Sequence, residues 1–431
     1  MSQAWLDAPD KMGLPDTQNG KPFRTAKKMM RNVYAEGRGC MADTDTAPED
    51  FRAEIAHWIE TNCPASLRNR PMGEDTMVWG GRRWQFRNDA QKDWLEAAIA
   101  RGMTAPRWPT EYGGAGLSRA QEKIYREEME RLGAPPPLES FGLWMLGPAL
   151  LAFGNDAQKA EHLPKITRGE IRWCQGYSEP GAGSDLANVQ TRAEDMGDHY
   201  LVNGQKIWTS YADQADWIFA LVRTDREAPK HLGISFLLMD MESPGITTRP
   251  IQLISGKSPF CETFFDNVKV PKENLVGTVN KGWDIAKYLL THEREMIGGG
   301  ARGLLGGRAL GQVLGDLEGA MDDPVIRAEA MACEVNSLAF AMTMERYKDR
   351  SEAGQGVGNA SAMLKYYGTE LNKRRYELLM SAGGSEALEW DGAHGALAPE
   401  WLRTKANSIE GGTSEVMLDI IAKRVLELPS R

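Results

Sequence analysis

The spacing of hydrophobic and polar positions changes twice along the chain. From Pro48 to about residue 170, apolar residues recur every three or four positions, as in "PEDFRAEIAHWIETNC", and this spacing predicts amphipathic helices. From about 171 to 280, short β-branched and aromatic runs such as "GISFLLMD" and "ETFFDNVKVP" predict strands. The helical spacing returns after "ENLVGTVNKGWD" and continues almost to Arg431. The predicted order is therefore helical, then β, then helical.

These changes divide the chain of 431 residues, which is long enough for more than one hydrophobic core. We expect an N-terminal arm (1–48), an N-terminal α-helical domain (49–170), a middle β domain (171–280) and a C-terminal α-helical domain (281–431). The arm is rich in Pro, Gly, Asp and Lys, a composition typical of segments outside a packed domain. Inside the β domain, Asn203-Gly204 stands between apolar runs and predicts a hairpin turn.

Composition excludes several classes of function. A formal net charge of -9 argues against a nucleic-acid-binding protein. No apolar run approaches the roughly 20 residues that a membrane span needs, and the N-terminus lacks a hydrophobic signal core. The five cysteines are scattered, without a CxxC pair or a tight Cys/His spacing, which predicts no zinc or other metal site and a reduced, cytoplasmic protein.

Two segments of the β domain have the composition of a ligand site. The loop "SEPGAGSD", Ser178 to Asp185, is rich in glycine, which lets a backbone approach a ligand closely, although an ordinary turn explains it equally well. Trp208, Thr209 and Ser210 offer a flat aromatic face beside two hydroxyls, which suits a planar heterocycle; a tryptophan in the core is the plain alternative.

A third segment, "EGGTSEV", precedes the amphipathic run "MLDIIAKRVL". Thr413 or Ser414 is the expected N-cap of that helix, and the N–H groups at its start can hold an anionic or polarised oxygen. Capping alone also explains the pattern.

A carboxylate interrupts the apolar stripe of the first C-terminal helix. Ile285, Leu289 and Met296 mark that stripe, and Glu293 lies four residues after Leu289 on the same face. Burial raises the proton affinity of a carboxylate, as a general base near neutral pH requires. A structural salt bridge to Arg294 or to a lysine is the alternative.

Taken together, "WPTEYGGAGLS", "SEPGAGSD", "NGQKIWTS", "VPKENLVG" and "GGTSEV" resemble the acyl-CoA dehydrogenase family in order and spacing, from about Pro48 to the end. The resemblance implies an α+β multidomain fold with an N-terminal helical domain, a middle β-barrel-like domain and a C-terminal four-helix-bundle domain. It also implies an FAD-dependent oxidoreductase that introduces a trans-2,3 double bond into an acyl-CoA, as in fatty acid β-oxidation. An electron-transfer flavoprotein is the implied electron acceptor.

Carried over by position, the resemblance assigns the residues that contact FAD. They come from the glycine-rich loop, from the end of the following strand and from the C-terminal segment: Tyr177, Ser178, Gly183, Ser184, Trp208, Thr209, Ser210, Thr413 and Glu415. Ser184 would also lie near the CoA arm of the substrate.

The resemblance offers two positions for the catalytic base. Many members have a Glu directly before Gly-Thr-Ser, but Gly411 fills that place here and Glu410 lies one residue too early. Other members, resembling isovaleryl- and long-chain acyl-CoA dehydrogenases, have a Glu-Arg on the first C-terminal helix, where this chain has Glu293-Arg294. Glu293 is therefore the expected base, the Gly411 N–H an expected donor to the thioester oxygen, and Arg294 an expected contact of the CoA moiety.

The chain departs from the family at one motif. An Arg-x-x-Phe-Gly run, whose Arg reaches FAD across a subunit interface in many members, is absent from "GDLEGAMDDPVIRAE". A homodimer or homotetramer is expected, and a heteromer remains open. Two other functions stay open as well: a flavin monooxygenase or nitroalkane oxidase on the same scaffold, and a non-catalytic partner subunit of a heteromeric dehydrogenase.

Overall fold

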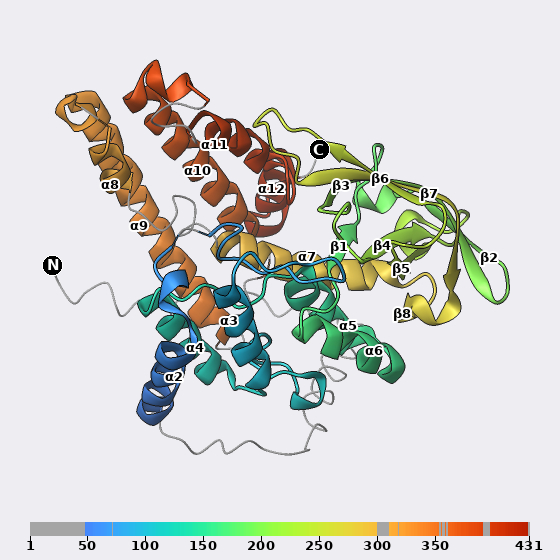
Figure 1. Cartoon of the computed structure of the whole chain (residues 1–431). Helices are drawn as coiled ribbons and strands as arrows, with labels where there is room; N and C mark the ends of the chain where they lie inside the picture. The colour runs from blue at the N-terminus through green and yellow to red at the C-terminus, as the bar shows by residue number, and fades with distance from the viewer. Residues whose placement is uncertain are drawn as a thin grey trace, which may run out of the picture. The chain divides into compact units, whose positions relative to one another are not determined.

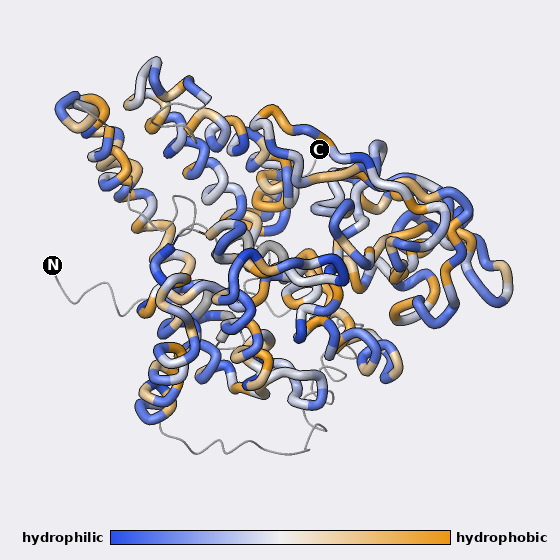
Figure 2. The backbone as a smooth tube through the Cα atoms, viewed as in Figure 1, coloured by the Kyte–Doolittle hydropathy of each residue, from blue (hydrophilic) through white to orange (hydrophobic). Residues whose placement is uncertain are grey.

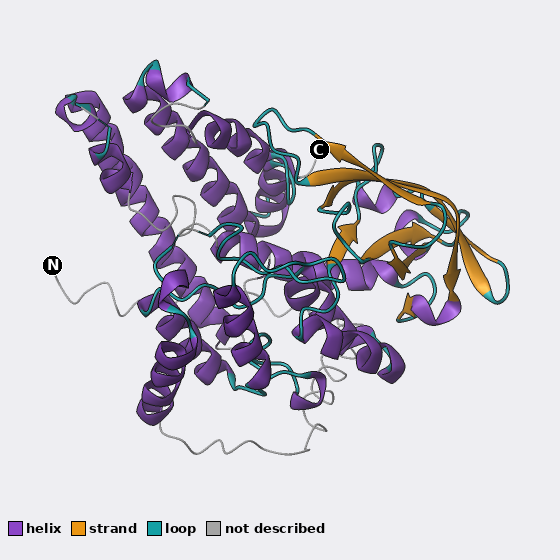
Figure 3. Ribbon diagram, in the orientation of Figure 1, coloured by secondary structure: helices purple, strands orange, loops and turns teal. Residues whose placement is uncertain are grey.

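The computed structural model describes residues 48–70, 72–299, 310–317, 319–352, 355, 358, 361–390 and 397–429, except the side chains of 291–299, 348, 351 and 352. The chain separates into two compact units, 1–50 and 51–431, and the description below concerns the second. The N-terminal arm therefore lies almost entirely outside the described residues. The strands form one continuous part of the chain, with the long helices before and after it, and Figure 3 shows them gathered together.

The first part of the fold is helical (Figure 1). Its helices are α2 (Pro48–Asn62), α3 (Asp89–Ala100), α4 (Arg119–Arg131), α5 (Gly147–Phe153) and α6 (Asp156–Thr167), and a π-helical turn, η4 (Gly142–Leu146), precedes α5. Local signals set the helix starts, since Asn88 caps α3 and capping boxes open α4 and α6. The helical spacing predicted that Phe51, Ile55, Trp58 and Ile59 share one face of α2; Phe51, Ile55 and Ile59 are buried, and Trp58 is half-buried.

The middle part is one eight-stranded sheet. Its strands are β1 (Trp173–Gly176), β2 (Arg192–Asp195), β3 (His199–Ser210), β4 (Trp217–Arg223), β5 (Ile234–Asp240), β6 (Ile246–Ile251), β7 (Phe260–Pro271) and β8 (Leu275–Val276). Their order is β6-β7-β3-β2-β4-β5-β8, and β1 pairs with β4 in parallel. The residues of β4 and β5 are buried along almost their whole length, so both faces of the sheet are covered at these strands.

The hairpin predicted at Asn203-Gly204 is wrong. Both residues lie inside the continuous strand β3, and the register with β7 shifts between Val202 and Gly204, as at a β-bulge. Gly204 has φ +152°, and a Cβ built there would lie 2.6 Å from the Thr191 hydroxyl oxygen. A bulge and a turn both favour glycine, so the dipeptide alone could not distinguish them.

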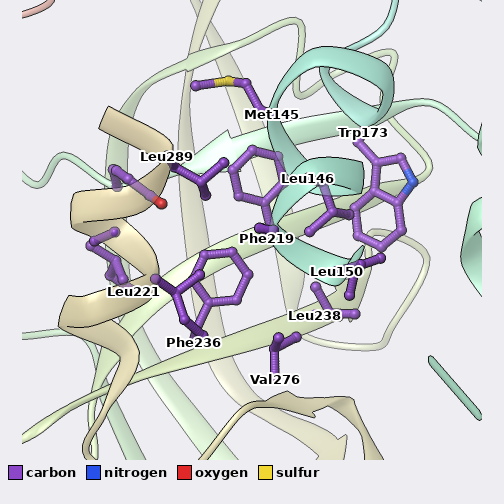
Figure 4. Packing of buried hydrophobic residues seen from close by; sticks show 14 of the residues in the cluster. Met145, Leu146, Leu150, Trp173, Phe219, Leu221, Phe236, Leu238, Val276 and Leu289 are labelled. Carbon is purple, nitrogen blue, oxygen red and sulfur yellow. The ribbon is translucent and has the colours of Figure 1, made fainter. Parts of the chain in front are cut away.

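The last part is again helical, with α7 (Gly282–Gly299), α8 (Leu310–Gly315), α9 (Pro324–Glu352), α10 (Ser361–Gly383), α11 (Leu397–Thr404) and α12 (Ser414–Ile420). Helix α10 contacts α7, α9, α11 and α12. The start of α7 packs on the sheet, where Leu289 lies among Phe219, Phe236 and Leu221 (Figure 4). The helix expected to carry the base is thus anchored by the stripe that the sequence predicted.

Glu139, just before η4, has an unusual environment. Its backbone N–H donates to the Val78 carbonyl at 2.7 Å, and its carboxylate has no hydrogen-bond or ion-pair partner among the described residues. Burial raises the pKa of Glu139 to about 7. Since the folded protein then holds this proton more tightly than the unfolded chain, stability falls as the pH rises from about 4.5 to about 7.

Replacing Glu139 with Gln should remove this pH-dependent penalty. We expect Glu139→Gln to match the wild type at pH 4 and to be more stable by about 1–2 kcal/mol at pH 8, allowing for partial exposure of the carboxylate. Urea unfolding at several pH values measures the difference. Asp93→Asn, at an exposed position on α3, is the control. A constant difference between Glu139→Gln and the wild type over this range would contradict the prediction.

Candidate functional site

The glycine-rich loop between β1 and β2 folds back on itself. The backbones of Glu179 and Ala182 exchange two hydrogen bonds of 3.0 Å each, and the Ser178 carbonyl accepts from the Ile207 N–H of β3 at 2.9 Å. Tyr177, at the start of the loop, is buried with its ring edge-on to Phe219 and Phe236. The loop therefore has a fixed base on the sheet.

A buried ion pair fixes the loop from below. Lys206 of β3 is fully buried, and its ammonium donates to the Glu179 carboxylate at 2.8 Å and to the Tyr177 carbonyl at 3.1 Å. The backbone N–H groups of Gln190 and Thr191 donate to the same carboxylate at 2.6 and 2.9 Å. The carboxylate thus has three donors, which together lock the loop to β2 and β3.

Burial disfavours both charges of this pair, so it acts on the pKa values of the two groups in opposite directions. Burial disfavours the charged carboxylate, but the attraction of Lys206 and the three hydrogen bonds outweigh it and hold the pKa of Glu179 below its usual value. Burial lowers the pKa of Lys206, and the attraction of Glu179 opposes that effect. Because the carboxylate has strong donors from the backbone as well, we treat the pair as ionised near neutral pH.

The tip of the loop is open. Gly181, Gly183 and Ser184 are exposed, and a Cβ built at either glycine would meet no atom within 4 Å. Neither glycine has a positive φ. Neither crowding inside the chain nor backbone conformation requires glycine there, and the missing side chains leave the backbone at the loop tip open to the close approach of a ligand.

The end of β3 is strained beside this loop. Trp208 has φ +61° at a second register shift of the β3–β7 ladder, yet it is 52% exposed, with its ring edge-on to Phe260 at 6.1 Å. A bulky residue in the left-handed region is an outlier, and such outliers cluster at functional sites. Ser210 is half-buried. Trp208 and Ser210 are thus both open to a ligand.

Thr209 differs from its neighbours. It is fully buried, and its hydroxyl has no hydrogen-bond partner among the described residues. Its side chain lies inside the protein, unlike that of Trp208, and the assignment of Thr209 to the cofactor stays a prediction.

The C-terminal segment forms a glycine turn before α12. Gly411 and Gly412 have φ +61° and +100°, and a Cβ on Gly412 would lie 2.5 Å from the Met417 methyl group. Thr413 is the N-cap of α12, since its hydroxyl accepts from the Val416 N–H at 3.2 Å. Glu415, in the first turn, is exposed. The turn therefore requires its glycines for conformation, independently of any ligand.

Polar side chains hold this turn in place and form hydrogen bonds to the Glu410 carboxylate. The Arg403 guanidinium donates twice to the Glu410 carboxylate, at 3.1 and 2.8 Å, and the Asn407 amide donates at 2.8 Å. The buried ammonium of Lys365 donates to the carbonyls of Gly412 at 2.5 Å and Asn407 at 3.0 Å. Both oxygens of the Glu410 carboxylate are thus bound within the turn, which leaves the carboxylate poorly placed to approach a substrate.

The C-terminal turn and the end of β3 share a neighbour. The guanidinium of Arg403 lies over the Phe260 ring at 5.8 Å, and the same ring contacts Trp208. Lys257, at the start of the loop into β7, forms an ion pair with Glu400 of α11 at 2.5 Å. Two of the three segments that the sequence singled out therefore lie side by side.

Helix α7 is the fourth region that the sequence singled out. Ile285, Ala286 and Leu289 are buried against the sheet and α5. Position 293 follows Leu289 by one helical turn, on the face of α7 that the stripe defines. The side chains of Glu293 and Arg294 lie outside the described residues, as does that of Met296, so their roles stay predictions.

Two features of the site have no counterpart among the sequence predictions. The Glu179–Lys206 pair and the Lys365 contacts both hold loops that were predicted, but the side chains themselves were not singled out. A signal existed for Lys206, because it stands at an alternating position of a strand whose neighbours on the same face are apolar.

The described part of the chain has neither a candidate metal site nor a candidate membrane span. No three His, Cys, Asp or Glu side chains there are grouped as a metal ion would need. No described helix has the length and apolar character for crossing a membrane. Cys63, Cys174, Cys261 and Cys333 are buried free thiols.

Known proteins match this chain along most of its length. Residues 77–170, 174–268 and 280–426 match family models described as the N-terminal, middle and C-terminal domains of acyl-CoA dehydrogenase. The acyl-CoA dehydrogenase IpdE1 of Mycobacterium tuberculosis is 35% identical over 388 residues, which cover 88% of this chain and 98% of IpdE1.

Solved structures agree. The structure titled "Tcur3481-Tcur3483 steroid ACAD" superimposes with a TM-score of 0.73 at 29% identity, covering 91% of this chain and 100% of that one. The ChsE4-ChsE5 complex from Mycobacterium tuberculosis gives 0.69 at 28%, covering 91% and 100%.

Proposed function

Because this chain belongs to the acyl-CoA dehydrogenase family, with the N-terminal helical, middle and C-terminal domains of that family, we propose that it is an FAD-dependent oxidoreductase that converts an acyl-CoA to the trans-2-enoyl-CoA. The observation that carries the proposal is the strained, half-exposed Trp208 beside a loop whose exposed glycines leave its backbone open to a ligand. Both features suit a flat cofactor with a phosphate-bearing tail.

The residues present fit FAD in size and chemistry. We assign Trp208 to the isoalloxazine ring, Ser210 to the region of N5, Tyr177 and Ser178 to the pyrimidine side, and Gly183 and Ser184 to the pyrophosphate. Thr413 and Glu415 are assigned to the ribityl and phosphate portion of FAD. Glu415 is exposed, so the cofactor could contact it. When bound, FAD supplies a hydride acceptor for the β-carbon of the substrate.

The chain's own groups perform the proton chemistry. We propose that the Glu293 carboxylate removes the α-proton, since Glu410 is held by Arg403 and Asn407. The Gly411 N–H is the proposed donor to the thioester oxygen, where negative charge develops as the proton leaves. Arg294 is proposed to contact the CoA moiety. An electron-transfer flavoprotein is the proposed electron acceptor.

Anaerobic titration tests the function. We expect the purified protein to be yellow and its absorbance near the flavin band to bleach on addition of an acyl-CoA. The substrate panel should contain short, branched and aromatic acyl-CoAs together with steroid-type ones, since one similar structure is titled a steroid ACAD. A yellow protein that no acyl-CoA bleaches, but that consumes oxygen with a nitroalkane, would contradict the proposal. A colourless protein that refuses FAD would make it a non-catalytic subunit.

An apolar stripe on α9 supports a homo-oligomer. Met331, Val335, Leu338 and Met342 are each between 63 and 67% exposed and follow each other at intervals of four, three and four residues. Figure 2 shows hydrophobic stretches recurring along α9, which is labelled in Figure 1. Such spacing is typical of a helix that packs on another helix. We propose that a second copy covers this α9 stripe.

The stripe fits an antiparallel second copy. The intervals read the same in both directions, so Met331 would face Met342 and Val335 would face Leu338 on the partner helix. Arg327 precedes the stripe and the exposed Glu345 follows it, so unlike charges would meet at both ends. Covering the exposed part of these side chains would remove apolar surface from water, which is the driving force for such a dimer.

A double substitution tests the stripe. Val335→Glu with Leu338→Glu should convert the oligomer to a monomer, because four carboxylates would be buried together in the interface. Light scattering after size exclusion measures the mass. Met196→Glu, at an exposed apolar position between β2 and β3, should leave it unchanged. A wild type that is monomeric alone and associates only with an unlike subunit would refute the second copy.

A further inference from the structure

Lys365, on α10, is a buried cation beside the glycine turn. It is 1% exposed, and its ammonium donates to the backbone carbonyls of Gly412 at 2.5 Å and Asn407 at 3.0 Å. Both acceptors are uncharged, and no carboxylate lies within ion-pair distance of the ammonium among the residues that the structure describes. Burial of a charge without a counter-charge is unfavourable, so a group kept in this state needs an explanation.

The acids around Lys365 have other partners. Burial lowers the pKa of Lys365, and the charges of Glu410 and Glu370 oppose that effect. Arg403 donates twice to the Glu410 carboxylate, and Glu370 forms an ion pair with Lys373 at 3.0 Å. Each of these two pairs has no net charge. The charge of Lys365 is therefore left uncompensated within this group of five side chains.

The charge of Lys365 acts on the N–H groups of the turn. Gly411 precedes Gly412, so its N–H lies within about 10 Å of the ammonium. The N–H groups of both glycines have no acceptor in the described part of the chain. Glu415, in the first turn of α12, also attracts Lys365, but it is exposed and water screens its charge. The unused N–H groups thus lie in a field that favours negative charge.

Helix α10 holds the turn at a second point. Its Asn372 side chain, which is also buried, donates to the Asn407 side chain at 2.8 Å. The same helix contacts both α12 and α7, the helix on which the base is expected (Figure 1). Lys365 and Asn372 therefore fix the turn to a helix that packs against α7. Only Lys365 adds a charge to that contact.

We propose that Lys365 is a positioning residue of the dehydrogenation. It fixes the carbonyls of Gly412 and Asn407, so that the Gly411 N–H points at the thioester oxygen, and its charge stabilises the negative charge that develops on that oxygen. The inference rests on the proposed function, because it supposes a CoA thioester whose oxygen lies at Gly411. Lys365 forms no bond to the substrate and transfers no proton, since the α-proton goes to Glu293. A charge that is in place before the reaction needs no rearrangement when the oxygen becomes negative.

A substrate analogue separates this effect from turnover. In a 3-thia acyl-CoA, sulfur replaces the β-carbon, so the α-proton can leave but no hydride can follow. The enolate beside oxidised FAD should give a long-wavelength charge-transfer band, and titration of that band with pH gives the apparent pKa of the bound α-carbon acid. The analogue should be built on the acyl group that bleaches the wild type best.

Removal of the charge should raise this apparent pKa. Lys365→Met keeps the length of the side chain, and Lys365→Gln keeps an N–H donor for the carbonyls, but both are neutral. We expect each variant to raise the apparent pKa by about one unit or more, because the enolate loses a nearby positive charge. Flavin reduction by the true acyl-CoA should slow about tenfold or more for the same reason. If Lys365→Met does not fold, Lys365→Gln alone decides.

Two other variants of α10 are the controls. Asn372→Leu breaks the hydrogen bond to Asn407 without changing the charge, so it should lower the stability to urea and leave the apparent pKa unchanged. Arg374→Met removes a positive charge from an exposed position of the same helix and should leave the apparent pKa unchanged as well.

The outcomes separate this inference from the proposed function. If the neutral Lys365 variants lose stability as Asn372→Leu does but keep the apparent pKa of the wild type, Lys365 only packs the turn and the inference is overturned. Bleaching of the wild type by acyl-CoA would then leave the proposed function standing. A wild type that gives neither the charge-transfer band nor bleaching would refute the proposed function, and the role of Lys365 with it.

Discussion

Glu293→Gln is expected to retain FAD and to reduce it with acyl-CoA at least about 10²–10⁴-fold more slowly than the wild type. The amide has nearly the shape of the carboxylate but cannot accept the α-proton. The buried Ile285 and Leu289 anchor α7, so the substitution one turn later should not disturb the packing of the helix on the sheet. Stopped-flow measurement of flavin bleaching under anaerobic conditions gives the rate.

Glu410→Gln is the matched control for this result. Its carboxylate is bound by Arg403 and Asn407, so its loss should alter the glycine turn and reduce the rate only modestly. Arg403→Gln should have a similar effect, because it disturbs the same turn without removing a carboxylate. If Glu410→Gln abolishes bleaching while Glu293→Gln does not, the base has been placed on the wrong helix. Equal FAD content in all three variants is needed for the comparison.

The order of helical and β segments could be predicted because hydrophobic spacing is a local property. Leu289 is buried at the place where the three-to-four spacing put it, and the strands "GISFLLMD" and "ETFFDNVKVP" form β5 and most of β7. The two glycine-rich segments and Trp208 could also be selected from the sequence, because several glycines close together, and a tryptophan beside two hydroxyls, are a composition that suits a ligand site. The domain boundaries and the roles of individual site residues stay predictions.

Other features depend on residues far apart in the sequence. Gly204 lies at a bulge opposite β7, whereas the same dipeptide in a hairpin would form a turn. Only the pairing of β3 with β7, which is distant in sequence, determines which of the two forms. Arg403 can donate hydrogen bonds to the Glu410 carboxylate only because α11 and the glycine turn lie side by side. Trp208 was selected for its ring, whereas its left-handed backbone is visible only in the folded strand.

The Glu179–Lys206 pair leads to the second large effect. Lys206→Met should lower the free energy of unfolding by about 3–5 kcal/mol, because it leaves the Glu179 carboxylate buried without its counter-charge. The methionine side chain would fill most of the space of the buried Lys206 side chain, so little of the lost stability would come from a cavity. The loop held by Glu179 should loosen, and the FAD content of the purified protein should fall. Urea unfolding and the flavin absorbance measure the two effects.

An exposed pair on the same loop is the control. Lys230→Met breaks the ion pair with Asp185 at the surface and should cost under about 1 kcal/mol. Glu179→Gln combined with Lys206→Met should recover part of the stability lost by Lys206→Met alone, because no unpaired charge remains. Since the fold holds the pKa of Glu179 below its usual value, the stability from this group is present above about pH 4.5 and is lost as the pH falls through the folded pKa.

The difference between wild type and Lys206→Met should therefore shrink on acidification, as the variant's carboxylate takes up a proton and its charge disappears. A difference that stays constant from pH 8 to pH 4 would mean that Lys206 contributes through packing of its methylene chain, not through its charge. In that case the loop would owe its position to the Gln190 and Thr191 N–H groups, and Glu179→Gln alone should displace it. The two substitutions thus decide between a charge that orders the glycine-rich loop and a backbone contact that does so.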